Sequence, residues 1–489
     1  MTQSTPRRAL AASQDQDSRR KWWALTASCI GTFVLLLDVT KVITALPQIE
    51  AQLHATAAGT EWVIDAYLLV MSATLLVFGA LADMFGHRRI FVLGLAVFTL
   101  ASFGGGLAGG PGILIAFRAA QGAGGAMIYA TSLSLLAQNF HGKQRGTAFG
   151  AWGAVTGLAT GLGPIIGGAL ASEFGWRAVL LVNVPIGAIA VVVTLYGVTV
   201  DDRARSEKRI DWAGFIIFTL ALLGIIYGVI RAGETSWTDA AALGAIISGI
   251  VLLAVFIVTE ARVAQPMFDL SLLRVPTFTG GLIAAFTMNG SLFALFVIYT
   301  SYLHNGLGYD ALQTGVRLLL ITGMTFTVST VAGKLSGRIP VRWLIGPGLL
   351  IVGIGILLTT GRTATSTWTT LITGFLIAGI GTGLVNPPLA STAVGVVEPH
   401  SAGMASGINT TFRMFGQALA IAVYGSILAT TLNTDGATRI GYAHALNNVA
   451  LIAGLVAITG AAFSVILIRT RDFAVNTPAK PAHGAVPDH

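Results

Sequence analysis

Residues 79–89 read Gly79-Ala-Leu-Ala-Asp83-Met-Phe-Gly86-His-Arg88-Arg89, a short charged segment between two long apolar runs. The flanking runs, 61–82 and 89–108, each have the roughly 20 residues that an α-helix needs to cross about 30 Å of hydrocarbon. The segment therefore predicts a tight turn between two membrane helices. We expect Asp83 to reach a helix N-terminus or a base and so to latch one conformation, with Gly79, Gly86 and Arg88 in the same gate. Plain anchoring of the loop by its arginines is the alternative.

Apolar runs of this length recur along almost the whole chain. Of its 489 residues, 54% are hydrophobic and 10% are charged, whereas an average soluble domain is about 25% charged. This composition has too few charges to cover a water-facing surface, so we predict an all-α integral membrane protein. The fourteen expected spans are 22–46, 61–82, 89–108, 112–137, 147–170, 176–198, 211–230, 240–260, 278–303, 313–333, 343–360, 367–391, 403–431 and 445–468.

The basic residues predict the orientation of these spans. Of the 29 Lys and Arg residues, 21 fall on the side of the N-terminus and 5 on the other, with Lys41, Arg118 and Arg413 inside spans. Basic residues favour the cytoplasmic side, and an even number of spans returns the chain to the side on which it began. We therefore expect a multi-pass protein of a bacterial cytoplasmic membrane with both termini in the cytoplasm.

The sequence contains an internal repeat. The segment from Gly79 has an echo from Gly333, an offset of 333 − 79 = 254, and two further glycine pairs recur at an offset of 257. The pairs at 257 are Gly122-Ala-Gly124 with Gly379-Ile-Gly381, and Gly146 and Gly150 with Gly403 and Gly407. Duplicated halves around a central site are typical of transporters. We predict a basic tail (1–21), a six-helix half (22–200), two inserted helices (201–275), a second six-helix half (276–470) and a tail (471–489).

Four ionisable residues in the first half lie at similar expected depths: Asp38, Lys41, Asp65 and Arg118. Each costs about 2.5–3.5 kcal/mol in a bilayer, so each needs a partner or a function. Asp38 and Lys41 lie three residues apart on one helix face, so they either simply pair with each other or belong to a proton-coupling site. In the second case Asp38 is the first candidate for the proton carrier, Asp65 the second, and Lys41 affects charge selectivity.

Three other groups of residues are candidates for the substrate pathway. Asn409, Arg413 and Gln417 form a polar stripe that either lines a cavity or bonds to a neighbouring helix. Phe293 and Phe296 either face the same cavity or pack in the core or against lipid. The fifth span is rich in small residues, which predict a deformable gate helix or a merely close-packed one. These residues are Gly157, Gly161, Gly163, Pro164, Gly167 and Gly168.

Several kinds of chemistry have no signature in the chain. It contains no phosphate-binding loop, no nucleophile elbow and no metal-ligand spacing, and Cys29 is its single cysteine. We therefore expect no enzyme, no cofactor and no metal, with a proton gradient as the energy source. The expected partners are a small-molecule substrate, protons and membrane lipid, without nucleic acid, and we expect a monomer.

These motifs together resemble the major facilitator superfamily, and in particular its fourteen-helix drug:proton antiporters. The likeness covers roughly residues 22–470. Residues 79–89 are similar to the signature between helices two and three, and residues 114–124 to the helix-four motif whose Arg is associated with proton transfer. Residues 157–168 are similar to a helix-five motif of exporters, and residues 176–187 and 37–47 to elements of the fourteen-helix branch.

The resemblance implies a drug, antibiotic or amphipathic metabolite exporter that exchanges its substrate for protons by alternating access. An importer of a small metabolite, or an exporter of an endogenous anionic metabolite, remains the alternative. Met84 and His87 stand where the family usually has bases, and Lys41 and Ile43 also depart from its pattern. A base beside the coupling acid favours an anionic or zwitterionic substrate over the lipophilic cations that are common in the family.

Overall fold

The computed structural model describes residues 5–55, 57–140, 142–198, 211–263, 266, 268–336, 338–397 and 402–476, apart from some side chains that include those of Asp65 and Pro164. The described ranges contain helices and no strand. In chain order the helices are α1 (Thr5–Leu53), α2 (Ala57–Phe85), α3 (His87–Gly106), α4 (Pro111–Asn139), α5 (Gly142–Phe174), α6 (Trp176–Leu181), α7 (Asn183–Gly197), α8 (Trp212–Glu234), α9 (Ala240–Glu260), η2 (Leu270–Arg274), α10 (Pro276–Met288), η3 (Asn289–Phe293), α11 (Ala294–Ser301), η4 (Tyr302–Gly306), α12 (Ala311–Leu335), α13 (Arg342–Leu357), η5 (Trp368–Leu371), α14 (Ile372–Gly395), α15 (Ala402–Asp435), α16 (Arg439–Leu467) and η7 (Thr470–Asn476).

The number of membrane crossings matches the prediction only in part. Among the described residues, twelve helical segments are long and apolar enough to cross a membrane. A thirteenth, α2, qualifies only as the pair Trp62–Leu75 and Val77–Phe85, which is bent by 51°. The remaining expected position is occupied by α13, whose 16 residues extend about 24 Å. The all-helical membrane fold is confirmed, and the total of fourteen crossings stays a prediction.

The bundle has an apolar exterior and a charged interior. Leu100 and Ile466 on the outside are 69% and 67% exposed, whereas Asp38, Lys41 and Arg118 are completely buried. A protein in water keeps its charged residues outside and avoids large exposed apolar surfaces. Hydrocarbon reverses this preference, and helices satisfy their own backbone groups within it. The protein is therefore a multi-pass membrane protein.

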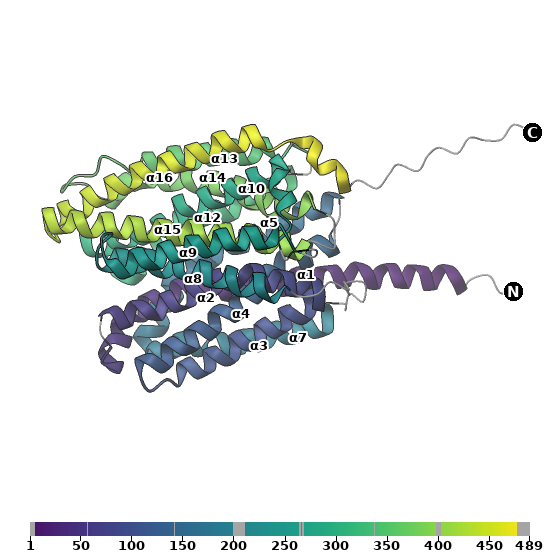
Figure 1. Ribbon diagram of the computed structural model, residues 1–489, viewed down its shortest axis with the longest axis horizontal. Coiled ribbons are helices and arrows are strands. Elements are labelled where there is room, and N and C mark those ends of the chain that lie inside the picture. Colours follow the sequence, from purple (N-terminus) through teal and green to yellow (C-terminus); the bar gives the residue numbers. More distant parts are fainter. Residues whose placement is uncertain are drawn as a thin grey trace, which may run out of the picture.

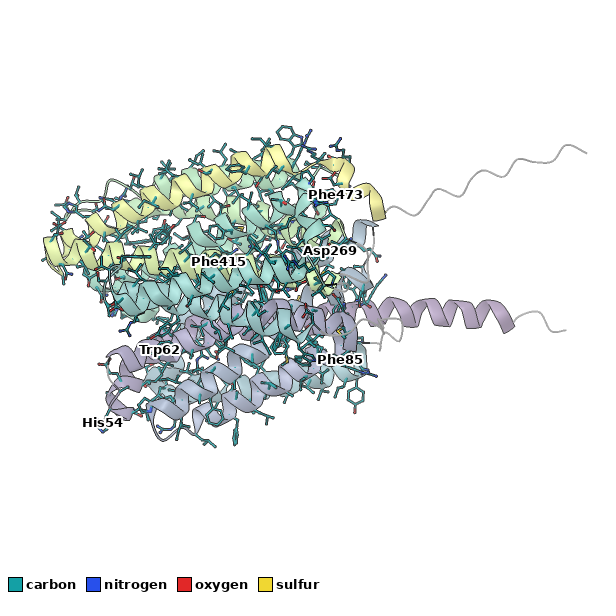
Figure 2. The ribbon with its side chains drawn as sticks, in the orientation of Figure 1. His54, Trp62, Phe85, Asp269, Phe415 and Phe473 are labelled. Atoms are coloured by element: carbon teal, nitrogen blue, oxygen red, sulfur yellow. The ribbon has the colours of Figure 1, made fainter. Side chains whose placement is uncertain are left out.

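Figure 1 shows α1–α4 and α7 on one side of the molecule and α10, α13, α14 and α16 on the other. The start of α1 and the η7 segment lie at the same end of the bundle, which we call the terminus end. Phe85 marks this end and Trp62 lies toward the opposite one, called the distal end (Figure 2). The two sides meet along two seams, one between α2 and α15 and one between α5 and α12.

The inserted helices α8 and α9 cover the first of these seams. Phe218 of α8 and Phe256 of α9 belong to one apolar cluster with Val77 of α2 and Ile408 of α15. Trp62 of α2 also packs against Tyr227 of α8, with ring centroids 5.9 Å apart. The pair thus adds apolar surface outside the junction of the halves. The domain boundaries derived from the sequence stay predictions.

The two halves repeat the same glycine contacts. A Cβ built on Gly124 would lie 2.7 Å from the amide nitrogen of Phe98, and one built on Gly381 would lie 2.6 Å from that of Val352. The partner residues are 352 − 98 = 254 positions apart, close to the offset of the glycines themselves. In each half the glycine lets α4, or its counterpart α14, lie directly on the backbone of the neighbouring helix. The repeat seen in sequence is therefore also a repeat of packing.

We expect Gly124→Ala and Gly381→Ala to lower the stability of the fold by about 1–3 kcal/mol each, because the added methyl group overlaps a backbone atom. Gly244→Ala in α9 is the matched control, since no atom other than those of its own local backbone and chain neighbours lies within 4 Å of its built Cβ. It should leave stability unchanged or raise it slightly, because Ala favours helix. Thermal unfolding of the purified variants in detergent measures this difference, and equal midpoints for all three would contradict it.

Candidate functional site

The membrane span after α5 is interrupted at Val182, which separates α6 from α7. Pro185 has no amide hydrogen, so the carbonyl of Leu181, four residues earlier, lacks its helical donor. The interruption lies where Asn183 begins α7 with its side chain completely buried. A local sequence effect therefore places a polar amide inside the first half of the bundle.

This amide belongs to a buried network around Asp38 of α1. Asn183 donates from Nδ2 to Asp38 Oδ1 at 2.7 Å, and the Lys41 ammonium lies 3.3 Å from the same oxygen. Lys41 also donates to the Asn183 side-chain oxygen. Arg118 of α4 forms an ion pair with the second carboxylate oxygen, Oδ2. All four side chains are completely buried, and they come from α1, α4 and α7.

Further contacts fix the orientation of Arg118. Its Nε donates to the Val63 carbonyl of α2 at 2.9 Å, and its Nη1 donates to Gln121 Oε1 at 2.9 Å. The guanidinium lies 4.4 Å from the centroid of the Tyr67 ring, a cation–π contact. Ser102 of α3 closes the network by accepting from both Gln121 and Asn183. The charged groups are therefore held by four helices besides α1.

The sequence left open whether Asp38 simply pairs with Lys41, and the structure places three polar partners on the carboxylate instead of one. One carboxylate and two cations give the cluster a formal charge of +1 if all three are ionised. The prediction missed the contact of Asn183, whose signal was an amide inside an otherwise apolar span. Asp65 lies on α2, but its side chain is outside the described part of the structure.

The small residues of α5 lie at two different contacts. Gly157 faces Thr325 of α12, with 2.9 Å between a built Cβ and the threonine Cγ2. Gly161 faces Thr322 on the same helix. Gly163 and Gly167 instead meet α1 beside Lys41, where a built Cβ on Gly167 would lie 2.6 Å from Thr44 Oγ1. α5 thus packs closely on its own half and on the other half.

Gly168 is only partly buried, and the Pro164 side chain lies outside the described residues. The role of this group of residues as a deformable gate stays a prediction, because close packing alone explains the contacts that the glycines make.

The segment 79–89 forms the tight turn that its residues predict. α2 ends at Phe85, Gly86 has a φ of 96°, and α3 begins at the next residue. Gly79 is buried on α2. Asp83 accepts a hydrogen bond of 2.6 Å from the backbone amide of Met404, in the first turn of α15. A carboxylate at a helix N-terminus satisfies a free N–H group and interacts favourably with the helix dipole. This contact joins the two halves at the terminus end.

Arg88, predicted to belong to the same gate, contacts its own half. Its Nη2 donates to the carbonyl of Leu195 in α7 at 2.5 Å. His87 lies closer to the acid, with its Nε2 3.4 Å from Asp83 Oδ1. The cross-half contact of this segment is thus carried by Asp83, while Arg88 attaches the turn to α7.

The polar stripe of the second half lies on α15, where Asn409 and Arg413 are buried and joined by a hydrogen bond of 3.2 Å. Gln417, one turn further, is only partly buried. Phe293 and Phe296 stack on each other with centroids 6.3 Å apart. They pack against separate clusters of the second half, so they are not brought to Arg413 by any described contact. Among the described residues, no group of three or more His, Cys, Asp or Glu is placed to hold a metal ion.

The model of the Major Facilitator Superfamily matches residues 28–421, most of the chain. The chain belongs to this superfamily. It is 33% identical to the multidrug resistance protein Stp of Mycobacterium tuberculosis over 419 residues, which covers 85% of this chain and 77% of that protein. It is 34% identical to the cephamycin export protein CmcT of Amycolatopsis lactamdurans, with 94% and 92% covered. The crystal structure of the human organic anion transporter MFSD10 shares the fold, with a TM-score of 0.63, 15% identity, and 89% and 99% covered. Membership shows a transporter and not an enzyme.

We expect Asp38→Asn to destabilise the protein by about 3–5 kcal/mol, because it leaves Arg118 and Lys41 buried without an anion. Adding Lys41→Met should recover part of this loss, since one of the two unpaired charges is then removed. Thermal unfolding of the two single variants and the double variant tests the coupling. Losses that simply add would show that the two side chains do not share one electrostatic network.

We expect Asp83→Ala to weaken closure of the terminus end by about 1 kcal/mol, because α15 loses the oxygen that accepts the Met404 amide hydrogen. Arg88→Gln is the control, since the hydrogen bond described for Arg88 is to Leu195 in its own half. The reporter is Ser329→Cys in a Cys29→Ser background, as Ser329 is buried on α12 at the other seam. Maleimide labelling should be roughly fivefold faster in Asp83→Ala than in the control. Equal labelling rates would remove Asp83 from the gate.

Proposed function

We propose that this transporter exports a drug, antibiotic or amphipathic metabolite across the cytoplasmic membrane in exchange for protons, by alternating access. Two observations support the proposal. The relatives of the chain include a multidrug resistance protein and a cephamycin export protein, each about one third identical over most of the chain. The first half also buries a carboxylate, Asp38, in contact with two cations inside the membrane-spanning region. The burial of Asp38 beside two cations supports the proton-exchange part of the proposal.

The proposed orientation places the terminus end in the cytoplasm, because the basic residues outside the spans gather there. In the present conformation this end is closed at both seams. Asp83 bonds the first turn of α15, and a Cβ built on Gly150 of α5 would lie 2.9 Å from the Cα of Gly333 in α12. Release of both contacts, by rocking of one half against the other, would open the cytoplasmic side to the substrate.

The charge balance around Asp38 suggests how a proton drives this motion. Protonation of Asp38 while Arg118 and Lys41 remain in contact would leave two buried cations without an anion. Proton uptake is therefore favoured only where the bases have moved away or have gained water. A proton thus binds to one conformation better than to the other, which is the requirement for driving a two-state transporter. In this proposal Asp38 carries the proton, Arg118 modulates its release, and Asp65 is the second candidate carrier.

The proposal includes no cofactor and no partner other than substrate, protons and lipid, with a single chain as the transporting unit. Export of an endogenous anionic metabolite is the second candidate function. The observation that favours it is Lys41, which is completely buried beside Asp38 and gives the network a formal excess of positive charge.

Gradient-driven transport in inside-out vesicles tests the function. We expect an imposed proton gradient to drive uptake of fluorescent dyes by wild type, and Asp38→Asn to abolish it, because the neutral side chain carries no exchangeable proton. Lys41→Val should raise uptake of the cation ethidium relative to the anion fluorescein, since it removes one positive charge. Gly244→Ala serves as a control for expression and insertion. Full gradient-driven uptake by Asp38→Asn would transfer the coupling assignment to Asp65, and uptake that does not depend on the gradient would overturn antiport.

A further inference from the structure

A second group of buried polar side chains lies nearer the terminus end, between the halves. Tyr129, Trp152, Asn386 and Arg413 come from α4, α5, α14 and α15 and are each at most 2% exposed. Each lies nine to eleven residues from the terminus end of its helix, a depth of about 14–17 Å. That depth corresponds to the middle of a hydrocarbon layer about 30 Å thick. With Asn409, one turn before Arg413, these five residues form what we call the donor cluster.

A chain of contacts connects the members of the donor cluster across the junction of the halves. Arg413 interacts with the hydroxyl of Tyr129, and its Nε donates to Asn409 Oδ1. The ring of Tyr129 lies 5.7 Å from that of Trp152. A Cβ built on Gly153, the next residue of α5, would lie 3.6 Å from the Cβ of Asn386. Tyr129 of the first half therefore lies beside Arg413 of the second half, and α5 meets α14 at Asn386, next to Trp152 in sequence.

The polar atoms of the second half are incompletely bonded. Arg413 Nη2, Asn409 Nδ2 and both polar atoms of the Asn386 amide have no hydrogen-bond partner. Among the described residues, no carboxylate forms an ion pair with Arg413. Buried polar atoms are rarely left unbonded, because each one loses its hydrogen bonds to water without a replacement, and the loss is larger for a charged group. Arg413 is thus a buried guanidinium in the middle of the membrane with an unbonded nitrogen and, among the described residues, without an ion-pair partner.

We propose that the donor cluster binds the anionic group of the transported substrate, with a carboxylate between Arg413 and Asn386 and an aromatic or apolar body against Trp152. A guanidinium is suited to a carboxylate because its planar fork donates two parallel hydrogen bonds. The amide of Asn386 offers a further donor, and the faces of Trp152 and Tyr129 offer apolar surface. The substrate class is therefore an amphipathic organic anion with an aromatic body.

This inference rests on the proposed function, because the cluster is buried here and is exposed to a substrate only when the halves separate. It is independent of the Asp38 network, which lies further toward the distal end. On α1, Thr32 accepts a hydrogen bond from Trp152 Nε1, and Asp38 follows six residues later, about 9 Å along the helix. The substrate's anion and the coupling proton thus have separate binding groups.

The test compares two ligands of the same shape, 2-naphthoate and 2-naphthamide, on the purified full-length protein in detergent. Ligand-dependent shifts of the unfolding midpoint yield the dissociation constants, with no gradient present. We expect wild type to bind the carboxylate at least tenfold more tightly than the amide. Arg413→Gln should lose this preference and Arg413→Lys should retain part of it, since the ammonium keeps the charge without the fork. Arg439→Gln, a change at an exposed arginine near the distal end, should leave it intact.

Asn386→Asp provides a second, independent variant. It introduces a negative charge into the donor cluster, so it should abolish naphthoate binding and leave naphthamide binding within about twofold. This variant decides the question if Arg413→Gln yields no folded protein. Equal binding of the two ligands by wild type, or a carboxylate preference that survives in Arg413→Gln or Asn386→Asp, would overturn the donor cluster as an anion site and leave Arg413 with a role in packing.

The binding result is separate from the proposed transport function. A carboxylate preference that depends on Arg413, in a protein whose vesicles show no gradient-driven uptake, would support the anion site and reject antiport. Gradient-driven uptake by a protein without that preference would do the reverse.

Discussion

The first half of this transporter is organised around one carboxylate, Asp38, whose two oxygens contact a lysine, an arginine and an amide away from water. Arg118 and Lys41 supply the charges, and Asn183 bonds both the acid and Lys41. Each partner depends on a different structural feature: α4 carries Arg118, α1 carries Lys41, and the helix break before α7 places Asn183. Loss of any one leaves a polar group unpaired in a medium of low dielectric constant, so the relative positions of these helices are strongly constrained.

The two seams between the halves are built differently. The α2–α15 seam is joined at the terminus end by a charged contact from Asp83 and is covered by the apolar pair α8 and α9. The α5–α12 seam consists of glycines against glycine or threonine, as at Gly150 with Gly333 and Gly157 with Thr325. The small side chains at these contacts let the two backbones approach closely, so the seam is held by dispersion forces between closely packed atoms. One seam therefore depends on a specific polar contact, and the other on the close packing of small residues.

The sequence predicted what depends on local pattern. Apolar runs indicated the helices, Gly86 the tight turn, and glycine spacing the duplicated packing of α4 and α14. It could not predict contacts that depend on the angle between distant helices. Asn183 meets Asp38 across 145 residues, and Arg88 bonds Leu195 instead of the other half. The donor cluster was missed for the same reason: Arg413 was visible as a charge in a span, but its neighbours Tyr129 and Trp152 are ordinary aromatic residues in sequence.

The separation of the two polar levels has a consequence for coupling. Asp38 lies about 9 Å along α1 from Thr32, which contacts the donor cluster, and two unit charges that far apart would interact by roughly 2 kcal/mol at an effective dielectric constant of about 20. A proton on Asp38 makes its network more positive, so direct electrostatics would strengthen the binding of an anion at Arg413 and favour cotransport. Exchange requires that proton binding weaken anion binding, so the coupling free energy must have the opposite sign. A conformational change must therefore contribute more free energy than this attraction. Movement of α1 against α5 is a candidate for this conformational change. Gly163 and Gly167 let α5 contact α1 closely beside Lys41, which lies beyond Asp38 toward the distal end. In the proposed mechanism, a displacement there would open the network to a proton and, through the hydrogen bond between Trp152 and Thr32, would also move the wall of the proposed anion site.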